Sequence, residues 1–240
     1  MQNAAFAELG LAWSYELLDV SQAELPGALA RLRQPEVAGA NVTIPHKQAA
    51  MQAMDSVDAD ALRARAVNTI VNQGGRLTGM NTDVAAIREA AAELNVKVPG
   101  SAVVVLGAGG AARAAAVALD GAHLSFVARH PEVADLPGRV VNWVDPGWQS
   151  QVRAADLLVN ATPLGRREEM PLRPNALPEH GAVLDLVYVS GGTPLVRKSR
   201  ALGLRTADGW GILLAQGAAS FTAWTGKPAP LAVMRETLSP

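Results

Sequence analysis

Cysteine is absent from the 240 residues of this chain. Disulfides and thiol chemistry are therefore excluded, together with the class of small secreted proteins that disulfides hold together. His46, His123 and His180 show no metal-ligand spacing, so no metal is expected. Positive charge is not in excess either, since the chain has 21 Lys and Arg and 22 Asp and Glu, a net charge of −1. Without a basic patch, neither a nucleic acid nor a membrane surface is an expected partner.

Long apolar runs are also missing. None approaches the roughly 18 to 20 residues of a membrane span. The opening MQNAAFAELG lacks the basic and then apolar segments of a signal peptide, so a cytoplasmic protein is expected. With 49% hydrophobic and 18% charged residues, the chain can form one large domain or two small ones.

A glycine-rich turn stands between a strand-like and a helix-like segment. The β-branched run 103–106 is typical of a buried parallel strand, and an alanine-rich segment with high helix propensity follows. Gly107 allows a tight turn, while Gly109 and Gly110 have no Cβ and let a pyrophosphate approach the backbone at the start of the helix. The pattern G-x-G-x-x-A predicts a dinucleotide site, with a plain strand-to-helix turn as the alternative.

Periodicity outlines the remaining elements. In the first hundred residues it predicts helices at 2–9, 22–32 and 84–94 and a helix through Met51, strands at 14–20 and 66–71, an extended run ending at Pro45, and a hairpin turn at Gly74 and Gly75. Later it predicts the strands of a doubly wound parallel sheet at 103–107, 123–128, 156–160 and 183–188. The last forty residues are predicted to be helical and to return to cover the first domain.

Eight motifs in one order resemble the shikimate dehydrogenase family, including its quinate-using relatives, over essentially the whole chain. They are NAAF near the start, G-x-NVTIPHK at 39–47, AVNT at 66–69, G-x-NTD at 79–83, GAGGAAR at 107–113, NATPLG at 160–165, D-x-VY and TPL within 185–195, and DGWGILLAQGA with F-x-x-WTG at 208–226. The resemblance implies an α/β fold, with a substrate-binding domain at 1–97 and 209–240 and an NADP-binding Rossmann domain at 98–208. It implies an NADPH-dependent oxidoreductase that reversibly reduces 3-dehydroshikimate to shikimate, on the route to chorismate and aromatic amino acids, as a monomer or homodimer.

Lys47 and Asp83 are the candidate catalytic residues. Interconverting an alcohol and a ketone needs a hydride carrier and a group that transfers the hydroxyl proton. The resemblance places the matching lysine and aspartate together over the reacting hydroxyl. A neighbouring carboxylate favours the ammonium form of lysine, so Lys47 is better suited to donating a proton to a ketone than to acting as a base. Taken alone, each residue is equally typical of a solvated surface lysine or a helix N-cap.

The remaining site residues are carried over by the same motifs. Substrate binding is predicted for Asn41, Thr43, Lys47, Asn68, Asp83, Tyr188 and Gln216. Cofactor binding is predicted for Gly107, Ala108, Gly109, Gly110, Ala111, Arg129, Asn160, Thr162, Leu186 and Gly209. Singly, each polar member is also typical of a cap, a turn or an interhelical hydrogen bond.

The segment FVARHP, at the end of the second Rossmann strand, favours NADP over NAD. An acidic residue that would bind a ribose 2′-hydroxyl is missing there, and Arg129 suits a 2′-phosphate. The family's usual Asn-Arg-Thr is replaced by Ala128, Arg129 and His130, so a weaker grip on NADP is expected.

The start of the chain is a further departure. The family's chain begins roughly twenty to thirty residues earlier, with a central strand and a Ser-x-Ser loop that binds the substrate carboxylate, and we expect these to be missing here. Two alternatives stay open: an NAD-dependent quinate or shikimate dehydrogenase, and a non-catalytic nucleotide-binding regulator.

Overall fold

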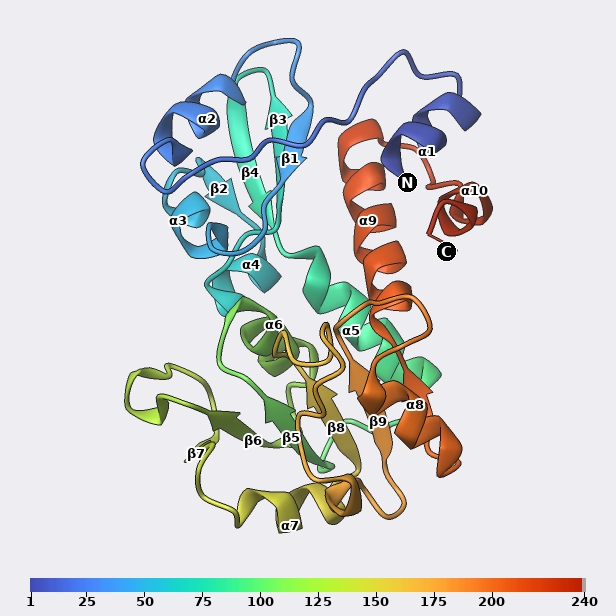
Figure 1. Cartoon of the computed structure of the whole chain (residues 1–240). Coiled ribbons are helices and arrows are strands. Elements are labelled where there is room, and N and C mark those ends of the chain that lie inside the picture. The colour runs from blue at the N-terminus through green and yellow to red at the C-terminus, as the bar shows by residue number, and fades with distance from the viewer. Residues whose placement is uncertain (239–240) are drawn as a thin grey trace. The chain divides into compact units, whose positions relative to one another are not determined.

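The structure, a computed structural model that describes residues 1–238, divides the chain into two compact units (Figure 1). Unit 1 comprises Met1–Asp83 and the residues from Leu214 onward, and unit 2 comprises Val84–Leu213. Helices α5 (Thr82–Glu93) and α9 (Gly209–Thr225) each run across the division. The predicted α/β class is confirmed. The domain boundaries predicted at 97/98 and 208/209 remain predictions.

Unit 1 contains a sheet in which two long strands occupy the centre. Its order is β1 (Gly39–Asn41), β3 (Thr69–Gln73), β4 (Arg76–Met80) and β2 (Ser56–Val57). The β3–β4 hairpin turns at Gly74 and Gly75, whose positive φ values glycine adopts readily, and this confirms the predicted turn. Strand β1 pairs antiparallel with β3, and β2 pairs parallel with β4.

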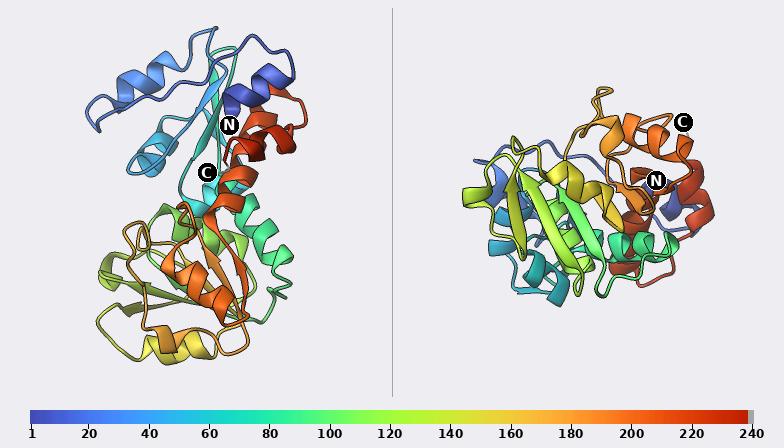
Figure 2. Two further views of the ribbon diagram at one scale, coloured as in Figure 1. Left: turned by 45° about the vertical axis from the view of Figure 1, so that its right-hand side comes forward. Right: turned by 90° about the horizontal axis from the view of Figure 1, so that it is seen from below.

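Two apolar clusters hold unit 1 together. One face of the sheet packs against α2 (Leu25–Arg31), α3 (Lys47–Gln52) and α4 (Ala59–Ala64) through residues that include Leu29, Ala50, Ala61, Ile70 and Leu77. The second cluster joins α1 (Gln2–Glu8), α9 and α10 (Leu231–Glu236), which lie side by side in Figures 1 and 2. Phe6 stacks on Phe221 with their ring centroids 5.4 Å apart. The predicted return of the C-terminal helices to the first domain is confirmed.

The strand predicted at 14–20 is wrong. Residues 11–20 form neither helix nor strand, although Asn3 holds the backbone of Tyr15 at both its N–H and its carbonyl, at 2.6 and 3.0 Å. Leu17 is 92% exposed. A strand-like pattern becomes a strand only where a neighbouring strand offers hydrogen bonds, and no described strand pairs with this segment.

Unit 2 is built on a parallel sheet, seen from two further sides in Figure 2. Its order is β10 (Arg205–Ala207), β9 (Ala182–Asp185), β8 (Leu157–Asn160), β5 (Ala102–Leu106), β6 (His123–Ala128) and β7 (Arg139–Asn142). Every pairing is parallel. The four predicted strands are confirmed, while β7 and β10 were missed because these short edge strands are half exposed and lack an apolar run.

The helices that lie wholly within unit 2 connect these strands as crossovers. They are α6 (Gly110–Ala118), α7 (Trp148–Arg153) and α8 (Pro194–Ala201), with short 3-10 turns at Pro131–Val133 and Pro174–Ala176. Their apolar faces bury the central strands, where Val105, Leu106, Leu158 and Leu184 have no exposed surface. The direction of the strand order reverses between β5 and β8. In open α/β sheets, the carboxyl ends of the strands at such a reversal point are where ligands bind.

Gly39→Ala should destabilise unit 1. A Cβ at this position would lie 2.1 Å from the carbonyl oxygen of Ile70 and 2.5 Å from Nε1 of Trp224. Overpacking of this kind costs about 1–3 kcal/mol. Gly27→Ala is the matched control, because Gly27 lies in α2 with nothing within 4 Å of its Cβ position, and alanine there should stabilise by about 0.5–1 kcal/mol. Urea unfolding followed by circular dichroism measures both, and equal effects would contradict the packing argument.

Candidate functional site

An ion pair between Lys47 and Asp83 is the centre of the candidate site in unit 1. Lys47 is the first residue of α3, and Asp83 lies in the first turn of α5. Nζ of Lys47 donates to Oδ2 of Asp83 at 2.5 Å, and the two side chains are only 17% and 16% exposed. The two side chains thus form a charged hydrogen bond that is largely shielded from water. The arrangement can hold a proton donor close to a bound carbonyl group.

Asn68 lies beside this pair. The backbone N–H of Val67 donates to the carbonyl oxygen of Lys47 at 2.9 Å, and that of Thr82 donates to Oδ1 of Asn68 at 2.8 Å. The side chain is almost fully buried, yet its Nδ2 has no hydrogen-bond partner within residues 1–238. An unpaired buried donor costs about 1–3 kcal/mol, which a ligand oxygen would offset. Asn68 is therefore prepared to donate to a ligand.

The other predicted substrate-binding residues of unit 1 differ in whether their polar atoms already make hydrogen bonds within the protein. Nδ2 of Asn41 donates to the carbonyl oxygen of Asn68 at 3.2 Å and to Oγ of Ser220 at 2.9 Å. This nitrogen is therefore already bound within the protein. Thr43 is exposed beyond the end of β1. Gln216 lies on α9, one turn before Ser220, whose hydroxyl donates to the carbonyl oxygen of Gln216 at 2.9 Å. Sequence reasoning missed Ser220, because nothing local marks a serine within a helix as part of a site.

The predicted cofactor loop follows β5 in unit 2. The N–H of Gly107 donates to Val127 O at 2.8 Å, and a Cβ on Gly107 would lie 2.9 Å from the carbonyl oxygen of Ala161. Gly107 has φ +114°, which a side chain would strain. Gly109 precedes the first turn of α6, which no side chain caps, and Gly110 and Ala111 begin the helix. The donors of a helix start are thus available to an anion such as a pyrophosphate.

Arg129 directly follows β6, two residues after the strand position that binds Gly107. Its side chain is exposed, and no ion pair to it occurs in the described part of the chain, whereas His130 lies 3.3 Å from Glu132. Ala128 is buried. The guanidinium of Arg129 is therefore free to meet a phosphate beside the glycine turn.

Asn160 is fully buried, and its side-chain amide is saturated by the protein. Nδ2 donates to Leu164 O at 3.0 Å and to Oδ1 of Asp185 at 2.9 Å, and Oδ1 accepts from the N–H and hydroxyl of Thr162. Burial raises the pKa of Asp185, while its hydrogen bonds act in the opposite direction. The backbone N–H of Leu186 donates to Asn160 O at 3.0 Å. Asn160 therefore shapes the loops after β8 and β9, and its side chain has no donor left for a cofactor.

Gly209 and Tyr188 also lie at the carboxyl end of β9 in unit 2. A Cβ on Gly209 would lie 2.5 Å from the carbonyl carbon of Val187, so only glycine fits. Tyr188 is 43% exposed, with its ring 5.3 Å from that of Trp210. Ala108, Thr162 and Leu186 are partly exposed in the neighbouring loops.

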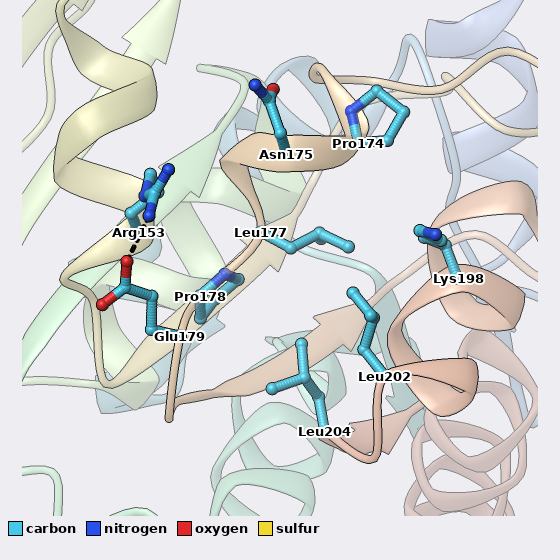
Figure 3. A pocket seen from close by; sticks show the side chains of 9 residues that line it. All are labelled: Arg153, Pro174, Asn175, Leu177, Pro178, Glu179, Lys198, Leu202 and Leu204. Carbon is cyan, nitrogen blue, oxygen red and sulfur yellow. Dashed lines mark hydrogen bonds and ion pairs between the residues drawn. The ribbon is translucent and has the colours of Figure 1, made fainter.

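A pocket of about 480 Å³ in unit 2 lies away from the cofactor loops of that unit (Figure 3). It is lined by Arg153, Pro174, Asn175, Leu177, Pro178, Glu179, Lys198, Leu202 and Leu204. These residues precede β8, β9 and β10, so the pocket lies at the amino ends of the parallel strands, opposite the glycine turn. It contains no predicted site residue.

Among residues 1–238, no group of three His, Asp or Glu side chains is placed to hold a metal ion. No helix in that range is both long enough and apolar enough to cross a membrane.

A parallel sheet in this strand order, with a glycine turn at the reversal point, is typical of dinucleotide-binding proteins. Comparison with known proteins gives the family. Residues 1–70 match the model described as the shikimate dehydrogenase substrate binding domain, and residues 209–238 match the shikimate 5′-dehydrogenase C-terminal domain. The chain belongs to the shikimate dehydrogenase family, as its motifs predicted.

Individual relatives agree over nearly the whole chain. The chain is similar to shikimate dehydrogenase (NADP(+)) of Moorella thermoacetica, with 44% identity over 99% of this chain and 86% of the relative. The protein of that name from Symbiobacterium thermophilum is 41% identical over 98% of this chain and 86% of its own length. The crystal structure of the Thermus thermophilus enzyme in complex with NADP(H) and shikimate matches with a TM-score of 0.85 and 36% identity, over 98% and 91% of the two chains. The two alternative functions are not favoured by these names.

Proposed function

We propose that this chain reduces 3-dehydroshikimate to shikimate with NADPH, and catalyses the reverse reaction with NADP⁺. The observation that carries the proposal is the buried Lys47–Asp83 pair beside the unpaired donor of Asn68. It lies in the unit that matches the family's substrate-binding domain. We further propose that the protein acts in the cytoplasm, as a monomer or homodimer.

Lys47 supplies the proton in this proposal. When NADPH is bound, it provides the hydride that reduces the carbonyl carbon. As negative charge develops on the carbonyl oxygen, the ammonium of Lys47 stabilises it and transfers a proton to it. Asp83 orients Nζ through the ion pair, and Lys47 takes up a proton from water before the next turnover. In the reverse direction Lys47 would first lose a proton to water, and its neutral amine would then accept the proton of the substrate hydroxyl.

Uncharged polar side chains are proposed to bind the ring hydroxyls and carboxylate. Asn68 contributes Nδ2, the donor that the protein leaves without a partner. Thr43, Gln216 and Tyr188 add further groups suited to a polyhydroxylated ring. Asn41 acts through Asn68 and Ser220.

The loops of unit 2 fit NADP. The backbone of residues 107–111 would hold the pyrophosphate, because the first turn of α6 has no side-chain cap and a Cβ on Gly107 would be strained. Arg129 would bind the 2′-phosphate. Thr162, Leu186 and Gly209 would contact the rest of the cofactor through loops whose shape depends on Asn160.

Lys47→Ala and Asp83→Asn should each reduce kcat by at least about a hundredfold, the usual scale for a positioned proton-transfer group. Steady-state assays with shikimate and NADP⁺ measure this effect. The affinity for NADP⁺ should stay nearly unchanged, because neither residue lies in the cofactor loops. Lys227→Ala is the matched control, since Lys227 is an exposed lysine of unit 1. Wild-type turnover in either site variant would remove the catalytic assignment.

Arg129→Ala should weaken NADP⁺ binding by about 1.5–3 kcal/mol, the scale of a hydrogen bond to a charged group, and leave NAD⁺ binding nearly unchanged. Titration calorimetry with each nucleotide measures the two affinities. Arg173→Ala, which removes another exposed arginine of unit 2, should change neither. Equal losses for both nucleotides would mean that Arg129 supports the fold or the shared part of the cofactor.

A further inference from the structure

Tyr15 reaches the candidate site from a segment that belongs to no helix or strand. Its hydroxyl donates to Oδ1 of Asn41 at 3.1 Å, and its ring lies beside Trp224 with a centroid distance of 6.0 Å. Asn3 fixes the backbone of Tyr15 on both sides. Burial raises the pKa of the Tyr15 hydroxyl, so it remains a donor at neutral pH. The ring contact with Trp224 and the backbone hydrogen bonds to Asn3 together orient the Tyr15 hydroxyl toward Oδ1 of Asn41.

The carbonyl oxygen of Asn68 decides which way the amide of Asn41 points, and the hydroxyl of Tyr15 holds the amide oxygen in that orientation. With Oδ1 held by Tyr15, Nδ2 faces the carbonyl oxygen of Asn68 at 3.2 Å, Oγ1 of Thr69 at 3.1 Å and Oγ of Ser220 at 2.9 Å. A carbonyl oxygen only accepts hydrogen bonds, so the nitrogen must be on this side. The rotated amide would place two oxygens against each other.

The same reasoning continues to Asn68. The backbone N–H of Thr82 can only donate, so the atom facing it at 2.8 Å must be Oδ1 of Asn68. Oγ1 of Thr69 also donates to this oxygen at 3.1 Å. Asn68 is thereby left with Nδ2 as its free donor. Asn41 contacts both the main chain of Asn68 and the hydroxyl of Thr69, so its orientation affects where that free donor lies.

We propose that Tyr15 is a positioning residue for substrate binding, because its hydroxyl fixes the amide of Asn41 and, through it, the place of the Asn68 donor. The inference rests on the proposed function, in which that donor binds a substrate oxygen. Tyr15 itself touches neither Lys47 nor Asp83 in any described hydrogen bond or ion pair. Its effect should therefore fall on substrate affinity and leave proton transfer largely intact.

Tyr15→Phe tests the proposal, since it removes only the hydroxyl and keeps the ring beside Trp224 and the backbone bonds to Asn3. We expect the KM for shikimate to rise about fivefold, the effect of one neutral hydrogen bond, with kcat within about twofold of wild type. The KM for NADP⁺ should not change. Thr78→Val is the matched control. It removes a hydroxyl of unit 1 that contacts Ser56 at 3.0 Å, outside this network, and should leave all three constants unchanged.

A double-mutant cycle separates positioning from general stability. In an Asn41→Ala background the amide is gone, so Tyr15→Phe should have no further effect on the KM for shikimate. An unchanged KM in the single variant overturns the inference, and so does an equal rise with and without Asn41. Wild-type turnover of shikimate tests the proposed function separately. An active wild type with an unaffected Tyr15→Phe variant refutes the positioning role alone, whereas an inactive wild type refutes both.

Discussion

The ion pair between Lys47 and Asp83 requires that the elements of unit 1 that carry these two residues be held in fixed positions. Two opposite charges 2.5 Å apart and mostly buried are kept only if the elements that carry them are fixed, because a displaced partner leaves an unpaired buried charge. Both elements are tied to the start of β3. Val67 binds the backbone of Lys47, and Asn68 binds the backbone of Thr82, next to Asp83. Geometry at the pair thus depends on one strand and the two residues before it.

The two buried asparagines Asn160 and Asn68 differ in how fully their side chains are hydrogen-bonded. Asn160 has its side-chain nitrogen and oxygen hydrogen-bonded within the protein, so it shapes the loops after β8 and β9. Asn68 has its oxygen bound and its nitrogen left over. Because proteins pair nearly all buried polar groups, the unpaired donor of Asn68 makes it the more informative of these two asparagines. The hydrogen bonds of the two side chains thus distinguish residues that the sequence motifs treat alike.

Sequence reasoning succeeded where the deciding interaction was local or recorded in a motif. Local sequence predicts the apolar strands β5, β6, β8 and β9 and the hairpin turn with its two glycines. Short motifs identified Lys47 and Asp83 as a pair. It failed at β7 and β10, whose pairing depends on an existing sheet edge, and at 14–20. It also missed Ser220, since a hydrogen bond between residues 179 positions apart leaves no periodic signal.

The failure at 14–20 and the role inferred for Tyr15 have one physical origin. A segment of strand length that has no neighbouring strand to pair with makes no ladder hydrogen bonds, and its side-chain contacts then decide its course. Asn3 holds Tyr15 near the N-terminal end of this segment, and His46 contacts the carbonyl oxygen of Val20 at the other end, 2.7 Å away. Leu17, between these anchors, stays in solvent. Because the anchored residues lie against β1 and the start of α3, the segment bears on the positions of Asn41 and Lys47 without adding a strand to the sheet.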